Sequence, residues 1–192
     1  MEADHYKTLF AGYDVVGLDY HADDPWEAIS EFKEFFHGDR KGHDSIILIA
    51  NSIGAYFSMC AFNYEQIDKA FFISPIVDME KLILDMMGWA DITEEKLREK
   101  QLITTGFGET LSWEYLCYVR NHPVNWSVPT YILYGDKDNL TSQETIHKFA
   151  DDVNAELTIM QNGEHWFHTA EQMAFLDDWI KKIHWIDIRQ GE

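Results

Sequence analysis

Cysteine is scarce in this chain, which has only Cys60 and Cys117 among its 192 residues. Two cysteines cannot form the disulfide framework of a small secreted domain, and both lie among apolar residues, where a thiol packs as a small hydrophobe. The beginning, Met1–Tyr6, is acidic and polar, unlike a secretory signal peptide. No run reaches the roughly 20 apolar residues of a membrane-spanning helix. We therefore expect a cytoplasmic protein that does not contact membranes.

Basic residues are also few. The chain has 15 Lys and Arg against 34 Asp and Glu, a formal net charge of −19. Such a surface repels phosphate backbones and anionic lipids, so nucleic-acid binding is not expected. Hydrophobic residues nevertheless make up 46% of the chain and aromatic residues 15%, which is enough for a sizeable core. The length favours a single domain that spans residues 1–192.

Five short apolar segments bounded by turn-forming residues predict buried strands. They are Tyr13–Leu18, Ser45–Ala50, Ala70–Ile73, Thr130–Tyr134 and Leu157–Met160. Amphipathic segments with helix signals alternate with them. Strand–helix alternation of this kind predicts the α/β fold class, with a mostly parallel sheet flanked by helices.

Helix-terminal signals support this alternation. Asp24, Pro25 and Glu27 are typical of an N-cap, a first-turn proline and a capping-box acid, and the helix is expected to run to about His37 with Gly38 just beyond its end. Two further capping-box spacings pair Thr141 with Glu144 and Thr169 with Gln172.

Residues 75–128 interrupt the alternation because they contain no strong strand signal. Helices are expected at Met79–Met87, Thr93–Gln101 and Ser112–Asn121. Inserted helices can cover the C-terminal edge of a parallel sheet, where ligands bind in such sheets. Ordinary crossover helices are the alternative. The length of the segment favours the first alternative, a helical lid that comprises residues 75–128.

The segment around Ser52 has the sequence of a nucleophile elbow. The apolar strand Ser45–Ala50 runs into Asn51-Ser52-Ile53-Gly54, and a helix is expected over Ala55–Asn63. Such a turn holds the serine in a strained conformation beyond the strand end, and small residues two before and two after it let strand and helix approach. Here those residues are Ala50 and Gly54. A Ser-x-Gly turn is also common in ordinary strand–helix loops.

Two later strands are followed by groups that could activate a serine. Gly135-Asp136-Lys137-Asp138 follows the strand Thr130–Tyr134, and His165 and His168 follow Leu157–Met160. A serine nucleophile needs a base, and the base needs an orienting acid. Each group lies just past the C-terminal end of a parallel strand, at the edge where Ser52 is expected. Either aspartate and either histidine could serve on this ground alone.

The order Ser, Asp, His resembles the α/β-hydrolase superfamily from about Gly12 to Ile180. The most specific segments are IANSIG, YGDKDNLTS and NGEHWFHT. In that family the acid commonly follows the strand-end glycine by three residues, and the histidine closely follows a glycine and precedes an aromatic residue. The resemblance thus implies the triad Ser52, Asp138 and His165.

The implied activity is serine hydrolysis of a small-molecule carboxylic ester through an acyl-enzyme intermediate. Ser52 is the implied nucleophile, His165 the base and Asp138 the orienting acid. The backbone N–H of Ile53 is an implied oxyanion donor. The negative surface favours a neutral or cationic ester over an anionic one.

The chain departs from the family pattern near its beginning. The family's second oxyanion donor comes from a loop after an earlier strand, usually marked by His-Gly, yet only Met1–Ala11 precedes Gly12. Phe36-His37-Gly38 ends a helix and does not replace that loop. A truncated gene is the favoured explanation. The alternative function is a catalytically weak or inactive binding protein with an α/β-hydrolase fold.

In the family, the absent strand lies between the strands that correspond here to Tyr13–Leu18 and Ser45–Ala50. We expect these two segments to pair directly, because buried backbone groups are costly to leave without partners. Pairing with another chain, in a homo-oligomer, is the second route.

No metal site or cofactor is expected. His165 and His168 with Glu164 and Glu171 lack a third well-placed ligand and a helix to align them. No glycine-rich phosphate loop follows a strand.

Overall fold

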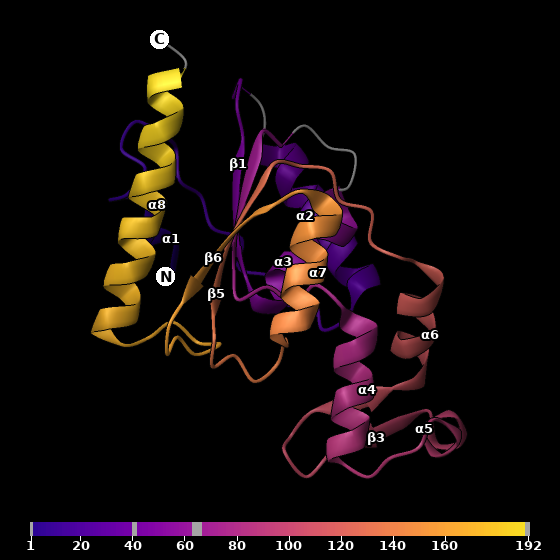
Figure 1. The fold of residues 1–192 in the computed structure, drawn as a ribbon. Helices are drawn as coiled ribbons and strands as arrows, with labels where there is room; N and C mark the ends of the chain where they lie inside the picture. Colours follow the sequence, from indigo (N-terminus) through magenta and orange to yellow (C-terminus); the bar gives the residue numbers. More distant parts are fainter. Residues whose placement is uncertain (1, 40–41, 63–66, 191–192) are drawn as a thin grey trace.

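A parallel four-stranded sheet forms the centre of the computed structural model, which describes residues 2–39, 42–62 and 67–190 (Figure 1). Its strands are β1 (Ile47–Asn51), β2 (Lys69–Ile73), β5 (Thr130–Gly135) and β6 (Glu156–Met160), in the order β1-β2-β5-β6. All three neighbouring pairs are parallel. The predicted α/β class with a mostly parallel sheet is therefore confirmed.

Helices cover both faces of the sheet. On one face lie α2 (Pro25–Asp39), α3 (Ser52–Phe62) and α7 (Gln143–Val153), and on the other lie α1 (Glu2–Tyr6) and the long α8 (Ala170–Gln190) (Figure 1). Side chains of a strand alternate between the two faces. Phe72 accordingly packs in the cluster with α2 and α3, whereas Phe71 packs in the cluster with α1 and α8. Two covered faces explain why these strands read as continuous apolar runs.

The helix ends agree only in part with the sequence signals. Asp24 caps α2 by accepting from the N–H of Glu27 at 2.9 Å. The prediction that Gly38 follows the end of α2 is wrong, because the helix continues through it to Asp39. Asn63, where we expected α3 to end, lies outside the described residues.

The two later capping boxes have different outcomes. Thr169 and Gln172 bond each other's backbone N–H groups, both at 3.2 Å, as the capping box predicts. The pairing of Thr141 with Glu144 is wrong. Ser142 caps α7 instead, because the Thr141 N–H donates to Asp138 and its hydroxyl donates to the Pro75 carbonyl.

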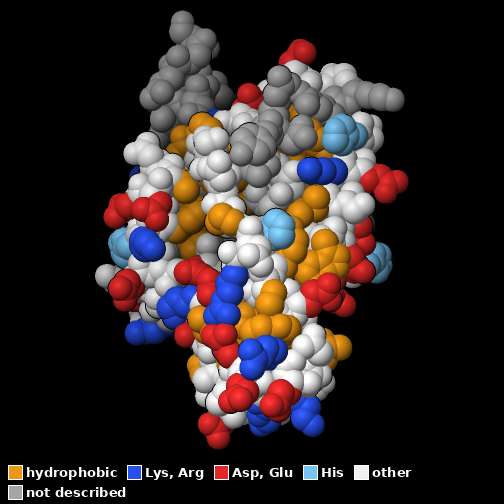
Figure 2. Space-filling view, turned by 90° about the vertical axis from the view of Figure 1, so that its right-hand side faces the viewer, with side chains coloured by type: hydrophobic (Ala, Val, Ile, Leu, Met, Phe, Trp, Pro, Cys, Tyr) orange, Lys and Arg blue, Asp and Glu red, His pale blue; other side chains and the backbone are white. Residues whose placement is uncertain are grey.

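The segment between β2 and β5 contains more than the predicted helices. It comprises α4 (Met79–Trp89), α5 (Glu94–Lys100), β3 (Leu102–Thr104), β4 (Thr110–Ser112) and α6 (Trp113–Asn121). The antiparallel hairpin of β3 and β4 was not predicted, since three residues a strand give too little pattern. Most Lys and Arg side chains on the face shown in Figure 2 lie over its lower part, where Figure 1 places this insertion.

The N-terminal part differs most from expectation. The predicted strand Tyr13–Leu18 is wrong, and so is its direct pairing with β1, because in the sheets that the described residues form this segment is not a strand and β1 lies at an edge. Two contacts hold it away from β1. Gly17 packs so closely on α1 that an added Cβ would lie 2.8 Å from Ala3 Cβ, and the Tyr20 hydroxyl lies against Gly54. A hollow of about 840 Å³ lies between the segment and β1.

No helix in the described parts of the chain is both long and apolar enough to cross a membrane.

Candidate active site

Ser52 occupies the sharp turn from β1 into α3. It is the first residue of α3 and has φ +48°, a left-handed value that is uncommon outside glycine. Backbone strain of this kind persists only where the surroundings enforce it, and it clusters at functional sites. One detail of the elbow differs from expectation. A Cβ on Gly54 would meet only the Tyr20 hydroxyl, at an ordinary 3.7 Å, so the space there would admit alanine.

His165 connects Ser52 to Asp138. Its Nε2 lies 2.8 Å from Ser52 Oγ, and its Nδ1 lies 2.7 Å from Asp138 Oδ2. The His165 side chain is 10% exposed and that of Asp138 is 0% exposed. A carboxylate at Nδ1 fixes the tautomer with the proton on Nδ1, which leaves Nε2 free to accept a proton from the serine hydroxyl. The three residues therefore form one continuous hydrogen-bonded relay.

Asp138 is held by its own loop as well as by His165. Its Oδ1 accepts from the backbone N–H groups of Leu140 at 2.8 Å and Thr141 at 3.0 Å. A buried carboxylate is costly unless its oxygens are hydrogen-bonded. These two donors satisfy one oxygen and leave Oδ2 directed at His165. The loop thus fixes the carboxylate before any substrate binds.

Asp136, the other aspartate left open by the sequence pattern, has a structural contact. Its Oδ1 accepts from the N–H of Asn162 at 2.7 Å, across to the loop after β6. The neighbouring Lys137 N–H donates to the Gly163 carbonyl at 2.8 Å. Asp136 therefore joins the two loops that carry Asp138 and His165.

A pair of glycines lets these loops meet, and sequence reasoning missed it. A Cβ on Gly135 would lie 2.3 Å from the Gly163 carbonyl oxygen and 2.9 Å from that of Glu164. Real Cβ atoms do not approach backbone so closely. The signal that could have revealed the contact is a glycine at the end of each of two adjacent strands, one at β5 and one just after β6.

The remaining histidine has no contact with this relay. His168 Nδ1 lies 2.6 Å from the Trp166 carbonyl, and its side chain is 54% exposed. In the part of the chain that the structure describes, no group of three His, Cys, Asp or Glu residues is arranged to hold a metal ion.

Ile53 follows Ser52 as the second residue of α3. The first N–H groups of a helix have no acceptor within the helix, and the helix dipole favours negative charge there. The Ile53 N–H is thus available to an oxygen beside Ser52. His37, from the misplaced His-Gly signature, instead contacts the Lys33 carbonyl of its own helix at 2.6 Å.

The thiol closest in sequence to this site is not activated. Burial raises the pKa of Cys60, in α3, to about 11. A thiol with that pKa is protonated at neutral pH and is a poor nucleophile.

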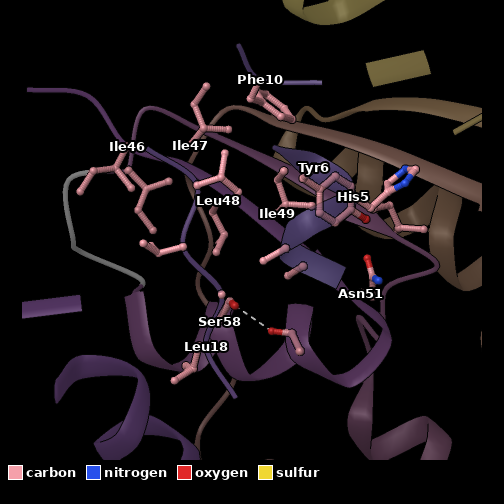
Figure 3. A pocket seen from close by; sticks show the side chains of 18 of the residues that line it. His5, Tyr6, Phe10, Leu18, Ile46, Ile47, Leu48, Ile49, Asn51 and Ser58 are labelled. Atoms are coloured by element: carbon pink, nitrogen blue, oxygen red, sulfur yellow. Dashed lines mark hydrogen bonds between the residues drawn. The ribbon is translucent and has the colours of Figure 1, made fainter. Parts of the chain in front are cut away.

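The hollow beside β1 opens directly onto Ser52. Its lining includes Ser52, Ile53, His165 and Trp166 at one end and the length of β1 along one side. Figure 3 shows Ile46, Ile47, Leu48 and Ile49 along it, with Asn51 toward the elbow and Leu18 and Ser58 below.

No protein-family model matches the chain, and no curated protein matches it in sequence. Solved structures do match. Est1E from Butyrivibrio proteoclasticus has a TM-score of 0.69 at 15% identity, over 86% of this chain and 71% of its own. Alpha/beta hydrolase domain-containing protein 10 from mouse has 0.68 at 14%, over 94% and 80%. A lipase-esterase related protein from Clostridium acetobutylicum has 0.57 at 16%, over 90% and 79%. The chain therefore has an α/β-hydrolase-like fold, and its structural neighbours are esterases and hydrolases.

Proposed function

We propose that the protein is a serine hydrolase that cleaves a small-molecule carboxylic ester. One observation carries the proposal: the relay from Ser52 Oγ to His165 Nε2 at 2.8 Å and from His165 Nδ1 to Asp138 Oδ2 at 2.7 Å. Nucleophile, base and orienting acid at these distances are the arrangement that activates a serine.

Ser52 Oγ attacks the ester carbonyl carbon while His165 Nε2 takes the hydroxyl proton. The Ile53 N–H donates to the oxyanion of the tetrahedral intermediate. The carbon–oxygen bond to the alcohol then breaks, and the alcohol leaves with the proton from His165. Water, deprotonated by His165, attacks the acyl-serine; the bond from the acyl carbon to Ser52 Oγ breaks, Oγ takes the proton from His165, and the acid is released. Asp138 stabilises the imidazolium in both halves of the reaction.

The surroundings favour a neutral or cationic ester. The described lining of the hollow beside Ser52 includes Asp14 and Asp19 but no lysine or arginine. An anionic acyl group would therefore meet repulsion without a compensating cation. Residues 75–128 act as a lid in this proposal, since they begin beside the nucleophile: the Ile76 N–H donates to the Ser52 carbonyl at 3.1 Å.

The test is ester hydrolysis and covalent labelling by a fluorophosphonate. The panel includes p-nitrophenyl acetate and butyrate and, because one structure of Est1E holds ferulic acid, methyl ferulate. Ser52→Ala should abolish hydrolysis and labelling. The matched control is Ser74→Ala, a serine at the end of β2 with φ +44°, whose buried hydroxyl has no partner in the described structure. This variant should keep the wild-type rate.

The second function, a weak or inactive binding protein, rests on the oxyanion hole. Ile53 is the single donor that the elbow supplies, and loss of one donor lowers turnover by on the order of 10²–10³. Labelling of Ser52 with slow turnover would indicate an activated serine with an incomplete hole. Wild-type protein that neither labels nor hydrolyses any ester would favour the binding function.

A further inference from the structure

We propose that the hollow beside β1 binds an extended apolar peptide segment of another polypeptide chain, which pairs with β1 as an added strand. Residues of β1, of the segment 12–20 and of α1 line this site. Figure 3 labels His5 and Tyr6 beside Ile49, and Leu18 below. The hollow reaches Ser52 at one end, and the proposal concerns the part that runs along β1; it rests on the sheet edge and not on the relay.

The backbone N–H and C=O groups of β1 point alternately toward β2 and into the hollow. Ala70 and Ser74 of β2 and its following turn donate their N–H groups toward β5, to Pro129 and Leu133 carbonyls. Because the backbone groups of successive strand residues point to opposite sides, the N–H and C=O of Phe71 point toward β1. In a parallel ladder one residue of each register pair directs its N–H and C=O into the ladder. Ile49 is the register partner of Phe71, so Ile49 and, two residues earlier, Ile47 direct theirs into the hollow.

These groups distinguish a peptide from an acyl chain. A hydrocarbon in the hollow would cover the N–H and C=O groups of Ile47 and Ile49 without bonding them, which is unfavourable. A peptide in β conformation offers the complementary donors and acceptors at the same spacing. Edge strands are templates for such pairing.

The size of the hollow fits one strand. A strand residue occupies about 3.3 Å along the chain, about 4.8 Å to the next strand and about 10 Å through the sheet, or roughly 160 Å³. A hollow of about 840 Å³ thus holds about five such residues, and β1 has 5.

The two faces of the hollow specify the side chains of the occupant. Ile47 and Val15 pack with the α1 and α8 cluster, whereas Leu48 and Leu18 pack with the α2 and α3 cluster. Apolar clusters on both faces call for apolar residues in both alternating positions. The bound peptide would also cover the side chain of Val16, which is 54% exposed.

The charged residues that line the hollow specify which residues the peptide should have at its two ends. Asp14 lies at one end of the wall, 4.0 Å from His43 before β1, and Asp19 lies toward the elbow. Since no lysine or arginine lines the described hollow, the peptide should carry basic residues at its ends. A second copy of the chain is a poor occupant, because β1 is walled by residues 12–20 and cannot meet the β1 edge of another copy.

The experiment measures amide hydrogen exchange by NMR in Ser52→Ala protein, so that hydrolysis plays no part. The probe is acetyl-Lys-Val-Ile-Val-Ile-Val-Lys-amide. It should slow exchange of the Ile47 and Ile49 amides at least tenfold. The exchange rates of the Leu48 and Ala50 amides, which face β2, should not change. The same peptide N-methylated at its five apolar residues keeps the side chains but loses the donors, and it should protect neither amide. Replacing both lysines by glutamate should weaken binding.

Several results would overturn the proposal. They are an absence of protection by the lysine-flanked peptide, equal protection by the N-methylated peptide, and displacement of the peptide by dodecanoate. Protection that rises with protein concentration alone would assign the hollow to a second copy and also overturn it. On the protein side, Ile47→Pro should lose binding, whereas Ile47→Ala, which keeps the backbone donor, should retain it. Should Ile47→Pro fail to fold, the exchange measurement still decides.

Discussion

Gly135→Ala should disable the candidate site although Gly135 is not one of the three hydrogen-bonded residues Ser52, His165 and Asp138. The added Cβ would lie 2.3 Å from the Gly163 oxygen, and ordinary contact begins at 3.4 Å, so the two loops must separate by about 1.1 Å. The obstructing atoms are backbone and cannot rotate away. Asp138 and His165 lie on these loops, and misplacement of catalytic groups by about 1 Å lowers rates by about 10². Overpacking should also destabilise the fold by about 1–3 kcal/mol.

The matched control is Gly54→Ala, two residues after the nucleophile. Its Cβ would meet only the Tyr20 hydroxyl, at 3.7 Å, and glycine within a helix is less stable than alanine by roughly 0.5–1 kcal/mol. Stability should therefore hold or rise, and kcat/KM should stay near wild type. Urea unfolding and hydrolysis of p-nitrophenyl butyrate measure both variants. Wild-type behaviour of Gly135→Ala, or equal damage from Gly54→Ala, would refute the reasoning.

Three further predictions follow from other contacts. Asp138→Asn should lower kcat by on the order of 10⁴ by disturbing the histidine tautomer, whereas Asp136→Asn, at a loop contact, should mainly lower stability, by about 1 kcal/mol; steady-state kinetics and urea unfolding separate the two. Arg120 holds the pKa of Glu94 below its usual range. The contribution of this pair to stability is therefore present above the ordinary glutamate pKa and is lost as pH falls through the lowered value. Between pH 6 and pH 3 the free energy of unfolding should fall less in Arg120→Met than in the wild type. Cys60, with a pKa raised to about 11 by burial, should react far more slowly with iodoacetamide at pH 8 than a free thiol, as mass spectrometry will show.

The sequence predicted the sheet and the convergence of its loops because both depend on local patterns. Short apolar runs bounded by turn residues locate β1, β2, β5 and β6, and parallel strands direct the residues after their C-terminal ends to one edge. Ser52, Asp138 and His165 each follow such an end, so their proximity could be anticipated. The choice between Asp136 and Asp138 needed the family resemblance, since both follow the same glycine.

The failures come from contacts that no local pattern encodes. Tyr13–Leu18 has the composition of a strand, but a ladder also needs a partner within reach, and α1 and Tyr20 hold this segment away from β1. Thr141 has a capping-box spacing, yet Asp138 takes its N–H. In both places long-range packing overrode a correct local signal.

The relay does not depend on whether the edge of β1 is covered. Asp138 is fixed by the N–H groups of its own loop, and His165 by the Gly135 and Gly163 contact. Ser52 is held from the β2 side through the bond of Ile76 to its carbonyl. The first two contacts lie in the loops after β5 and β6, and the third lies on the β2 side of β1. An added strand would therefore change the wall beside Ser52 and leave Ser52 in place, so the proposed peptide binding and the proposed hydrolysis can be tested separately.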